Sequence, residues 1–224
     1  MPRTGEIADL TPAGTPPTVY AADMPPFDRG RALEAGARAD VAVVGAVDAG
    51  LSTALHLARA GRSVRVLEAA TVGAGASGRN GGQLHSGQRK DQVTLEATVG
   101  RAAARRLWEC GEAAKALVRE IAARDRHGCF LADGLIAAAA TPRHRDELAA
   151  YAEHLARHYD YERTTVLSAA ETAAAIGSER YVGGVRDGGA FHLDPYRLAR
   201  ALAEAAVEAG AVVDERARVA DIRR

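Results

Sequence analysis

Residues 39–68, ADVAVVGAVDAGLSTALHLARAGRSVRVLE, carry the pattern that most constrains the fold of this chain. The apolar run Val41–Val44 predicts a buried parallel strand that ends at Gly45, and apolar residues then recur at helical spacing up to Gly61. Val64–Leu67 predicts a second strand. A strand, a helix and a strand in this order predict the βαβ unit of a dinucleotide-binding, Rossmann-like α/β fold.

The turn between the first strand and the helix departs from the usual dinucleotide fingerprint at one position. That fingerprint is G-x-G-x-x-G, followed about 20 residues later by an acidic side chain. Gly45 and Gly50 occupy the outer glycine positions, and Glu68 lies 18 residues after Gly50. Val47 stands where the middle glycine belongs, and Asp48 follows it. We expect this isopropyl group and this carboxylate to hinder the approach of a pyrophosphate to the helix N-terminus.

A second glycine-rich loop follows the second strand. Residues 71–83, TVGAGASGRNGGQ, are mostly small and include the run Arg-Asn-Gly-Gly. Because such a loop has little side chain to bury, its expected use is a close backbone approach to a bulky, flat ligand.

The acidic strand end and this loop together resemble the flavoprotein family of D-amino-acid, sarcosine and glycine oxidases. The segments SGRNGGQLHSGQ and PPTVYAADMPP are most similar to the gamma-glutamylputrescine oxidoreductase branch, and the resemblance runs from about Val19 to the last residue. It implies an FAD/NAD(P)-binding Rossmann-like domain joined to part of an antiparallel α+β substrate domain. It also implies FAD as cofactor and a small amine or amino acid as substrate, oxidised at its C–N bond by hydride transfer to the flavin.

The resemblance further implies a cofactor site made from both loops and from the end of the chain. Glu68 would contact the adenosine ribose, and the loop residues would lie along the pyrophosphate and the flavin. His85 and His192 are the candidates for catalytic contacts, although a lone histidine is more often a structural residue. The expected cofactor-binding residues are Gly45, Ala46, Val47, Gly50, Glu68, Ala69, Ser77, Arg79, Asn80, Gly81, Gly82, Gln83 and Val219.

Composition and pattern divide the chain into four segments. Residues 1–38 are rich in Pro, Gly, Ala and Thr and predict an extended N-terminal arm, mobile at least up to Thr18. Residues 39–90 hold the FAD-binding βαβ core and the glycine-rich loop. Residues 91–193 predict a helical segment with a partial substrate domain, and residues 194–224 a helix and a strand that return to the FAD domain.

Helical periodicity, turn glycines and capping residues locate the elements after residue 90. Tyr151, Tyr159 and Tyr161 surround a helix end and are interpreted as packing residues. The expected elements are a helix over Asp91–Arg126 broken near Gly100, short strands bracketed by Gly128 and Gly134, a helix over Arg143–Tyr159 that Pro142 starts, a helix over Thr172–Ile176 behind a Ser168/Glu171 capping box, a helix over Tyr196–Ala209 capped by Asp194 and Pro195, and two short strands in Ala211–Arg224 around Asp214–Arg218.

Charge, cysteine usage and length restrict the possible partners. The 29 basic and 29 acidic residues balance, which disfavours nucleic acid and anionic membranes as partners. Cys110 and Cys129 belong to no metal or disulfide motif, and no run is apolar enough to span a bilayer, so we expect no metal and a cytoplasmic location. Because the resembling flavoproteins are much longer, the chain is interpreted as a truncated N-terminal half, with a separately encoded C-terminal half as a possible partner.

Three functional hypotheses remain open. The first is an FAD-dependent amine or amino-acid oxidoreductase. The second is a non-catalytic remnant or pseudoenzyme with weakened FAD binding, which Val47, Asp48 and the short chain favour. The third is an NAD-binding dehydrogenase module, which shares only the βαβ unit. The loop Arg79–Gly82 argues against the third hypothesis, because a nicotinamide enzyme does not need it.

Overall fold

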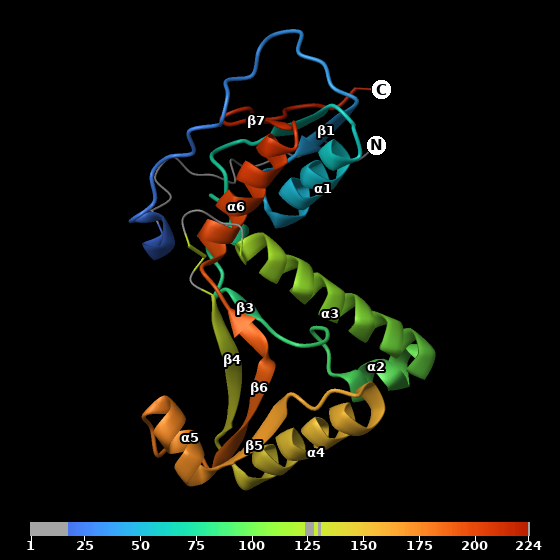
Figure 1. Ribbon diagram of the computed structural model, residues 1–224, viewed down its shortest axis with the longest axis vertical. Coiled ribbons are helices and arrows are strands. Elements are labelled where there is room, and N and C mark those ends of the chain that lie inside the picture. The colour runs from blue at the N-terminus through green and yellow to red at the C-terminus, as the bar shows by residue number, and fades with distance from the viewer. Residues whose placement is uncertain (1–17, 124–127, 130, 224) are drawn as a thin grey trace, which may run out of the picture. The chain divides into compact units, whose positions relative to one another are not determined.

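The computed structural model describes residues 18–123, 128–129 and 131–223, which form two compact units (Figure 1). The first unit comprises the described parts of residues 1–80, 124–129 and 194–224. The second comprises those of residues 81–123 and 130–193. Each unit contains its own β-sheet.

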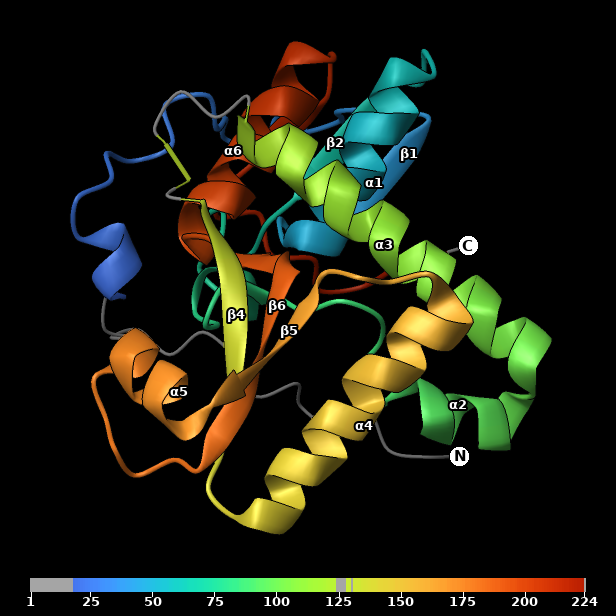
Figure 2. The same ribbon diagram turned by 60° about the horizontal axis from the view of Figure 1, so that its bottom comes forward.

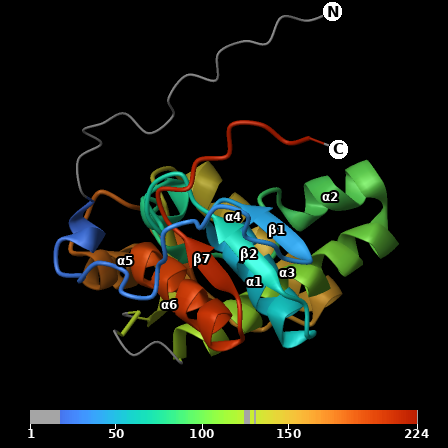
Figure 3. The ribbon, with the colours of Figure 1, turned by 90° about the horizontal axis from the view of Figure 1, so that it is seen from above.

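A parallel sheet in the order β1–β2–β7 forms the centre of the first unit. Its strands are β1 (Val41–Val44), β2 (Val64–Leu67) and β7 (Val212–Asp214), and both pairings are parallel. Helices α1 (Asp48–Arg59) and α6 (Pro195–Glu208) lie side by side on one face of this sheet (Figure 3). The predicted βαβ unit is therefore confirmed.

The two helices of the first unit begin and end where their sequences predict. Helix α1 buries the expected apolar positions, among them Leu51 and Leu55, and it is followed by Gly61, whose φ is +79°. At the start of α6, the carboxylate of Asp194 accepts hydrogen bonds from two backbone N–H groups of the first turn, at 2.9 and 3.0 Å. Pro195 is the first helical residue, where its missing N–H leaves no bond unmade.

The two ends of the chain differ from their predictions. The described part of the expected extended arm contains a short 3-10 helix, η1 (Val19–Ala21), and pairs at Arg31 with the edge of β7. The second strand expected after β7 does not form within residues 215–223, which the structure describes. Instead Arg216, at φ +56°, turns the chain, and the N–H groups of Arg216 and Ala217 donate to carbonyls just after β2. Residues 1–17, expected to be mobile, lie outside the described residues.

An antiparallel sheet forms the centre of the second unit, and its longest strand pairs with all the others. That strand is β6 (Gly183–His192), and its partners are β3 (Gln83–Leu84), β4 (Ala132–Ala139) and β5 (Thr164–Ser168) (Figure 2). Gly134 lies inside β4, at φ +91° and at a shift in register, and does not bracket two short runs as expected. A glycine with positive φ at a shift in register is typical of a G1-type β-bulge.

The helices of the second unit follow their local signals. They are α2 (Gln92–Val99), α3 (Arg101–Ala123), α4 (Pro142–Tyr159) and α5 (Ala169–Ile176). The break between α2 and α3 falls at Gly100 as predicted.

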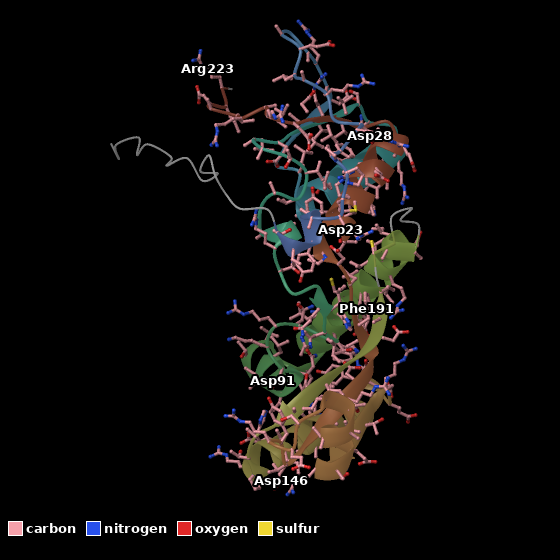
Figure 4. The ribbon with its side chains drawn as sticks, turned by 90° about the vertical axis from the view of Figure 1, so that its left-hand side faces the viewer. Asp23, Asp28, Asp91, Asp146, Phe191 and Arg223 are labelled. Atoms are coloured by element: carbon pink, nitrogen blue, oxygen red, sulfur yellow. The ribbon has the colours of Figure 1, made fainter. Side chains whose placement is uncertain are left out.

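Side-chain caps fix two of these helix starts. Asp91, marked in Figure 4, caps α2 by accepting a hydrogen bond from the N–H of Thr94 at 2.8 Å. The predicted capping box of Ser168 and Glu171 is present at the start of α5.

Aromatic side chains from α3, α4 and the segment before β5 form the core of the second unit. Trp108 packs against Tyr159 and Tyr161 with ring centroids 5.2 and 5.1 Å apart, and Leu155 completes the buried cluster. Tyr151 packs on its border. The packing role expected for the three tyrosines is confirmed, but Tyr161 also belongs to a polar network described below.

Candidate functional site

The turn between β1 and α1 can form only with glycine at both outer positions. Gly45 has φ +99°, a region that other residues rarely adopt. A Cβ atom on Gly50 would lie 2.1 Å from the carbonyl oxygen of Gly45, so a side chain there would push the helix away from the strand. These glycines therefore hold the start of α1 close against the end of β1.

The N-terminus of α1 has no capping hydrogen bond from the side chain of its N-cap residue, Val47. Val47 is the N-cap residue in an extended conformation, and its side chain offers no acceptor to the first-turn N–H groups. Its Cγ2 atom would be 3.9 Å from a Cβ placed on Gly45, so the isopropyl group lies against the turn. The helix end presents backbone donors and a positive dipole end beside an apolar group.

Asp48 places a buried carboxyl in the first turn of α1. Its Oδ1 atom has no hydrogen-bond partner among the described residues, and its backbone N–H donates to Ser77 Oγ at 3.1 Å. Burial raises the pKa of Asp48, and the hydrogen bond with the Ser77 side chain opposes this increase. The carboxyl lies next to the helix end where a bound phosphate would add further negative charge.

Glu68, at the end of β2, joins three parts of the candidate site. Its Oε2 accepts a hydrogen bond from Ala46 N at 2.7 Å, and its Oε1 accepts one from Ala70 N at 2.8 Å. Each carboxylate oxygen has capacity for a second donor, such as a ribose hydroxyl. The sequence suggested only a ligand contact, whereas the structure also gives this side chain a role in fixing the glycine turn and, through Ala70 N, the short turn that contains Ala69.

The second glycine-rich loop folds onto the start of α1 through Ser77. Its short 3-10 helix, η2 (Ala76–Gly78), requires glycine at its last position, because a Cβ on Gly78 would lie 2.2 Å from a backbone oxygen. The exposed side chains of Arg79 and Asn80 donate to carbonyls of the same loop, at 2.8 to 3.2 Å. The loop is thus held by its own backbone acceptors.

The remaining expected residues lie in other parts of the chain. Gly81, Gly82 and Gln83 begin the second unit, and Gln83 pairs there with His192 across β3 and β6. His85 is exposed on the loop after β3. Val219, half-buried in the first unit, follows Ala217, whose N–H donates to the carbonyl of Glu68 at 2.7 Å. The structure therefore brings those expected site residues that lie between Gly45 and Asn80 in the sequence into one site within the first unit.

A buried ion pair that the sequence did not suggest supports this site from within the sheet. Arg65 on β2 donates to both carboxylate oxygens of Asp214 on β7, at 2.5 and 3.0 Å, and Asp214 is fully buried. The hydrogen bond to Asp214 raises the pKa of Arg65. The two residues are 149 positions apart, so no local pattern could have revealed the pair.

A cavity of about 730 Å³ lies on the opposite face of the same sheet. It is lined by residues 33–39 together with Ala42, Arg65 and Leu67. Val43 faces α1, since a Cβ on Gly50 would lie 3.3 Å from its Cγ1, so its neighbour Ala42 points away from that helix. This cavity is therefore separate from the N-terminus of α1.

Among the residues that the structure describes, neither a metal centre nor a membrane-spanning helix is found. No three His, Cys, Asp or Glu side chains in that part of the chain are grouped so that they could hold a metal ion. None of the described helices has both the length and the apolar composition needed to cross a membrane.

Comparisons with known proteins agree with this geometry. The family model described as FAD dependent oxidoreductase matches residues 40–224. "Probable oxidoreductase OrdL" of Rhizobium meliloti is 34% identical over 174 residues, which cover 78% of this chain and 41% of that protein. Gamma-glutamylputrescine oxidoreductase of Escherichia coli is 36% identical over 184 residues, covering 80% of this chain and 41% of that protein.

A solved structure shows the same fold. Glycine oxidase from Geobacillus kaustophilus superposes with a TM-score of 0.64 at 28% identity, over 83% of this chain and 49% of that chain. The chain spans about two-fifths of the length of the two curated relatives described above, 41% of each.

Proposed function

This chain belongs to the family of FAD dependent oxidoreductases, and from this premise we propose that its first unit binds the ADP part of FAD where β1 meets α1. The observation that carries the proposal is the meeting of three features at one place. These features are a turn that only glycine can form, a helix N-terminus without a hydrogen bond from its N-cap side chain, and the Glu68 carboxylate at the end of β2. Together they match what a dinucleotide requires.

Different residues of the first unit would contact different parts of the cofactor. Glu68 accepts a ribose hydroxyl while it keeps the turn in place through Ala46 N. Ser77 holds the second loop against the helix start, and Arg79 brings an exposed guanidinium to the same loop. When bound, FAD supplies the acceptor for a hydride from the carbon next to an amine nitrogen.

Two residues fit this role poorly and lower the expected affinity. Fitting the Val47 isopropyl group into a close contact costs about 1–3 kcal/mol, which is roughly one to two powers of ten in the dissociation constant. The buried Asp48 carboxyl adds repulsion whenever it is ionised. Asp48 favours a second candidate function, that of a non-catalytic remnant that binds FAD weakly.

The substrate class that we propose for the complete enzyme is a small amine or amino acid. It is supported by the names of two proteins to which this chain is similar, gamma-glutamylputrescine oxidoreductase and glycine oxidase. A second polypeptide carrying the segments that these relatives have beyond the matched part is a further proposal. Location in the cytoplasm stays a prediction.

A titration of the flavin-free chain tests the cofactor proposal. FAD and NAD are added separately, and binding is followed by flavin fluorescence and by calorimetry. We expect FAD to bind more tightly, because the second loop serves a flavin nucleotide and has no role for nicotinamide. Tighter binding of NAD would contradict the proposal and favour the dehydrogenase hypothesis.

A further inference from the structure

The second unit contains a cavity that the proposed function does not use. It has a volume of about 200 Å³ and is bounded by β4, β5, β6, α4 and the loop after β3. Figure 2 shows α4 running beside these strands. Most of the wall is aliphatic, as at Leu135, Leu148 and Leu155. Its polar groups come from His85, Ser86, Tyr151, Thr164 and Asp187.

The carboxylate of Asp187 is held firmly by one oxygen only. Its Oδ1 accepts hydrogen bonds from the Tyr161 hydroxyl at 2.5 Å, from Gly189 N at 2.9 Å and from Ala190 N at 3.2 Å. Its Oδ2 has no hydrogen-bond or ion-pair partner among the residues that the structure describes. The carboxylate is therefore fixed in direction and has one oxygen available to a ligand.

A chain of hydrogen bonds behind Asp187 sets the direction of each proton. Lys115, only 8% exposed, donates from Nζ to Ser86 Oγ at 2.6 Å, and Ser86 Oγ lies 2.6 Å from the Tyr161 hydroxyl. Because Ser86 accepts from a cation and Tyr161 donates to a carboxylate, the Ser86 proton points to Tyr161. The chain runs in one direction from Lys115 to Asp187.

The charges of this network do not cancel. The ammonium of Lys115 lies 3.0 Å from Glu112 Oε1, so these two groups neutralise each other. Asp187 forms no ion pair within the described residues, and its carboxylate belongs to a wall that is mostly aliphatic. A carboxylate in such a place favours a cation that brings its own apolar surface.

We propose that this cavity binds a small alkylammonium ion, whose charged nitrogen pairs with Asp187 Oδ2 and whose hydrocarbon chain lies among the aliphatic side chains. At about 30 Å³ for each water-sized group, the volume accommodates roughly six or seven non-hydrogen atoms. A primary amine with four or five carbons has that size. The inference goes beyond the proposed FAD site, because it concerns only the second unit and requires no flavin.

Binding of n-butylammonium to the flavin-free full chain tests the proposal. n-Butanol and butyrate serve as probes of the same length without the positive charge. We expect both to bind about 10- to 100-fold more weakly than the ammonium ion, since a hydrogen bond to a charged group contributes that much. In amide NMR spectra, the ammonium ion is expected to shift the signals of Gly189 and Ala190 first, because their N–H groups bind the same carboxylate.

Three variants distinguish ammonium binding in this cavity from nonspecific attraction to the surface of the unit. Asp187→Asn keeps an acceptor for Tyr161 and removes the charge, so we expect it to weaken ammonium binding about 10- to 100-fold. Asp133→Asn, on the exposed carboxylate that pairs with Arg119 in the same unit, should leave binding unchanged. Ala137→Leu fills the cavity and should abolish binding even if Asp187→Asn proves unstable.

Several outcomes would overturn the proposal. These are equal binding of butanol and butylammonium, unchanged binding in Asp187→Asn or in Ala137→Leu, and amide shifts confined to the first unit. None of them would affect the FAD proposal, which is measured by a different titration on the other unit.

Discussion

Asp48 in the first unit and Asp187 in the second are both carboxylates near a place that could receive a ligand, and they are supported very differently. Asp187 Oδ1 accepts three hydrogen bonds, whereas Asp48 Oδ1 is buried and accepts none among the described residues. A fully hydrogen-bonded carboxylate fixes its surroundings, while a carboxylate with one buried oxygen left without a donor lowers the stability of the folded state. The comparison suggests that Asp187 organises its unit and that Asp48 opposes the anion that its unit would bind.

The largest expected effect is the loss of stability when the Asp187 carboxylate is removed, compared with removal of the Asp48 carboxylate. Asp187→Ala leaves the Tyr161 hydroxyl and two backbone N–H groups without their acceptor, so we expect it to lower the free energy of unfolding by about 2–4 kcal/mol. Asp48→Ala removes an unsatisfied group and should change it by less than about 1 kcal/mol, or raise it. Urea unfolding followed by circular dichroism measures both. If Asp48→Ala lowered the free energy of unfolding as much as Asp187→Ala, the two carboxylates would not differ in how they support their units.

The next effect concerns Val47, which borders the same helix end as Asp48. Val47→Gly removes the isopropyl group from the turn, and we expect FAD to bind roughly 10- to 100-fold more tightly. Val19→Gly, which removes the same group from an 81% exposed position of the first unit, is the matched control. Fluorescence titration measures both affinities. An unchanged affinity in Val47→Gly would mean that no pyrophosphate approaches this turn.

The pH dependence of the first unit should reveal Asp48 directly. Burial raises the pKa of Asp48 above its ordinary 3.8, so the folded chain holds a proton that the unfolded chain releases. The free energy of unfolding contributed by this group is therefore fully present below pH 3.8 and falls as the pH rises through the folded-state pKa. A bound pyrophosphate raises that pKa further. FAD affinity should therefore also decrease as the pH rises and Asp48 ionises.

Asp48→Asn is the control for this pH dependence. It cannot ionise, so its FAD affinity should vary less with pH than that of the original chain, as measured by titrations in a series of buffers. If both proteins give the same pH profile, Asp48 does not face the bound nucleotide.

The smallest expected effect is at Ser77, whose hydroxyl accepts a hydrogen bond from the backbone N–H of Asp48 and so joins the second loop to α1. Ser77→Ala removes the acceptor of the Asp48 N–H and should lower the free energy of unfolding by about 0.5–1.5 kcal/mol. It also removes the hydrogen bond that opposes the raised pKa of Asp48, so the decrease of FAD affinity should move to higher pH. Thr53→Ala, which removes an exposed hydroxyl bonded within α1, is the control. Identical unfolding of Ser77→Ala and the original chain would show that the loop is held in another way.

Local chemistry explains which parts of the fold the sequence predicted. The break at Gly100, the capping box of Ser168 and Glu171, and the start of α6 at Asp194 depend on residues within one turn of each other. The βαβ unit depends on the periodicity of one continuous segment, from Val41 to Leu67. Such signals can be read without knowing the neighbours in space. The glycine positions of the nucleotide turn are of the same kind.

Tertiary structure decided everything that depends on distant residues. The bulge at Gly134 is set by pairing with β6, and the chain turns at Arg216 because carbonyls after β2 accept its donors. By itself, the sequence determined that a dinucleotide-type turn with Val47 and Asp48 exists. Only the three-dimensional structure decided that Asp48 Oδ1 lacks a donor while Asp187 Oδ1 receives three, because hydrogen bonding and burial depend on which distant groups the fold brings within about 3 Å.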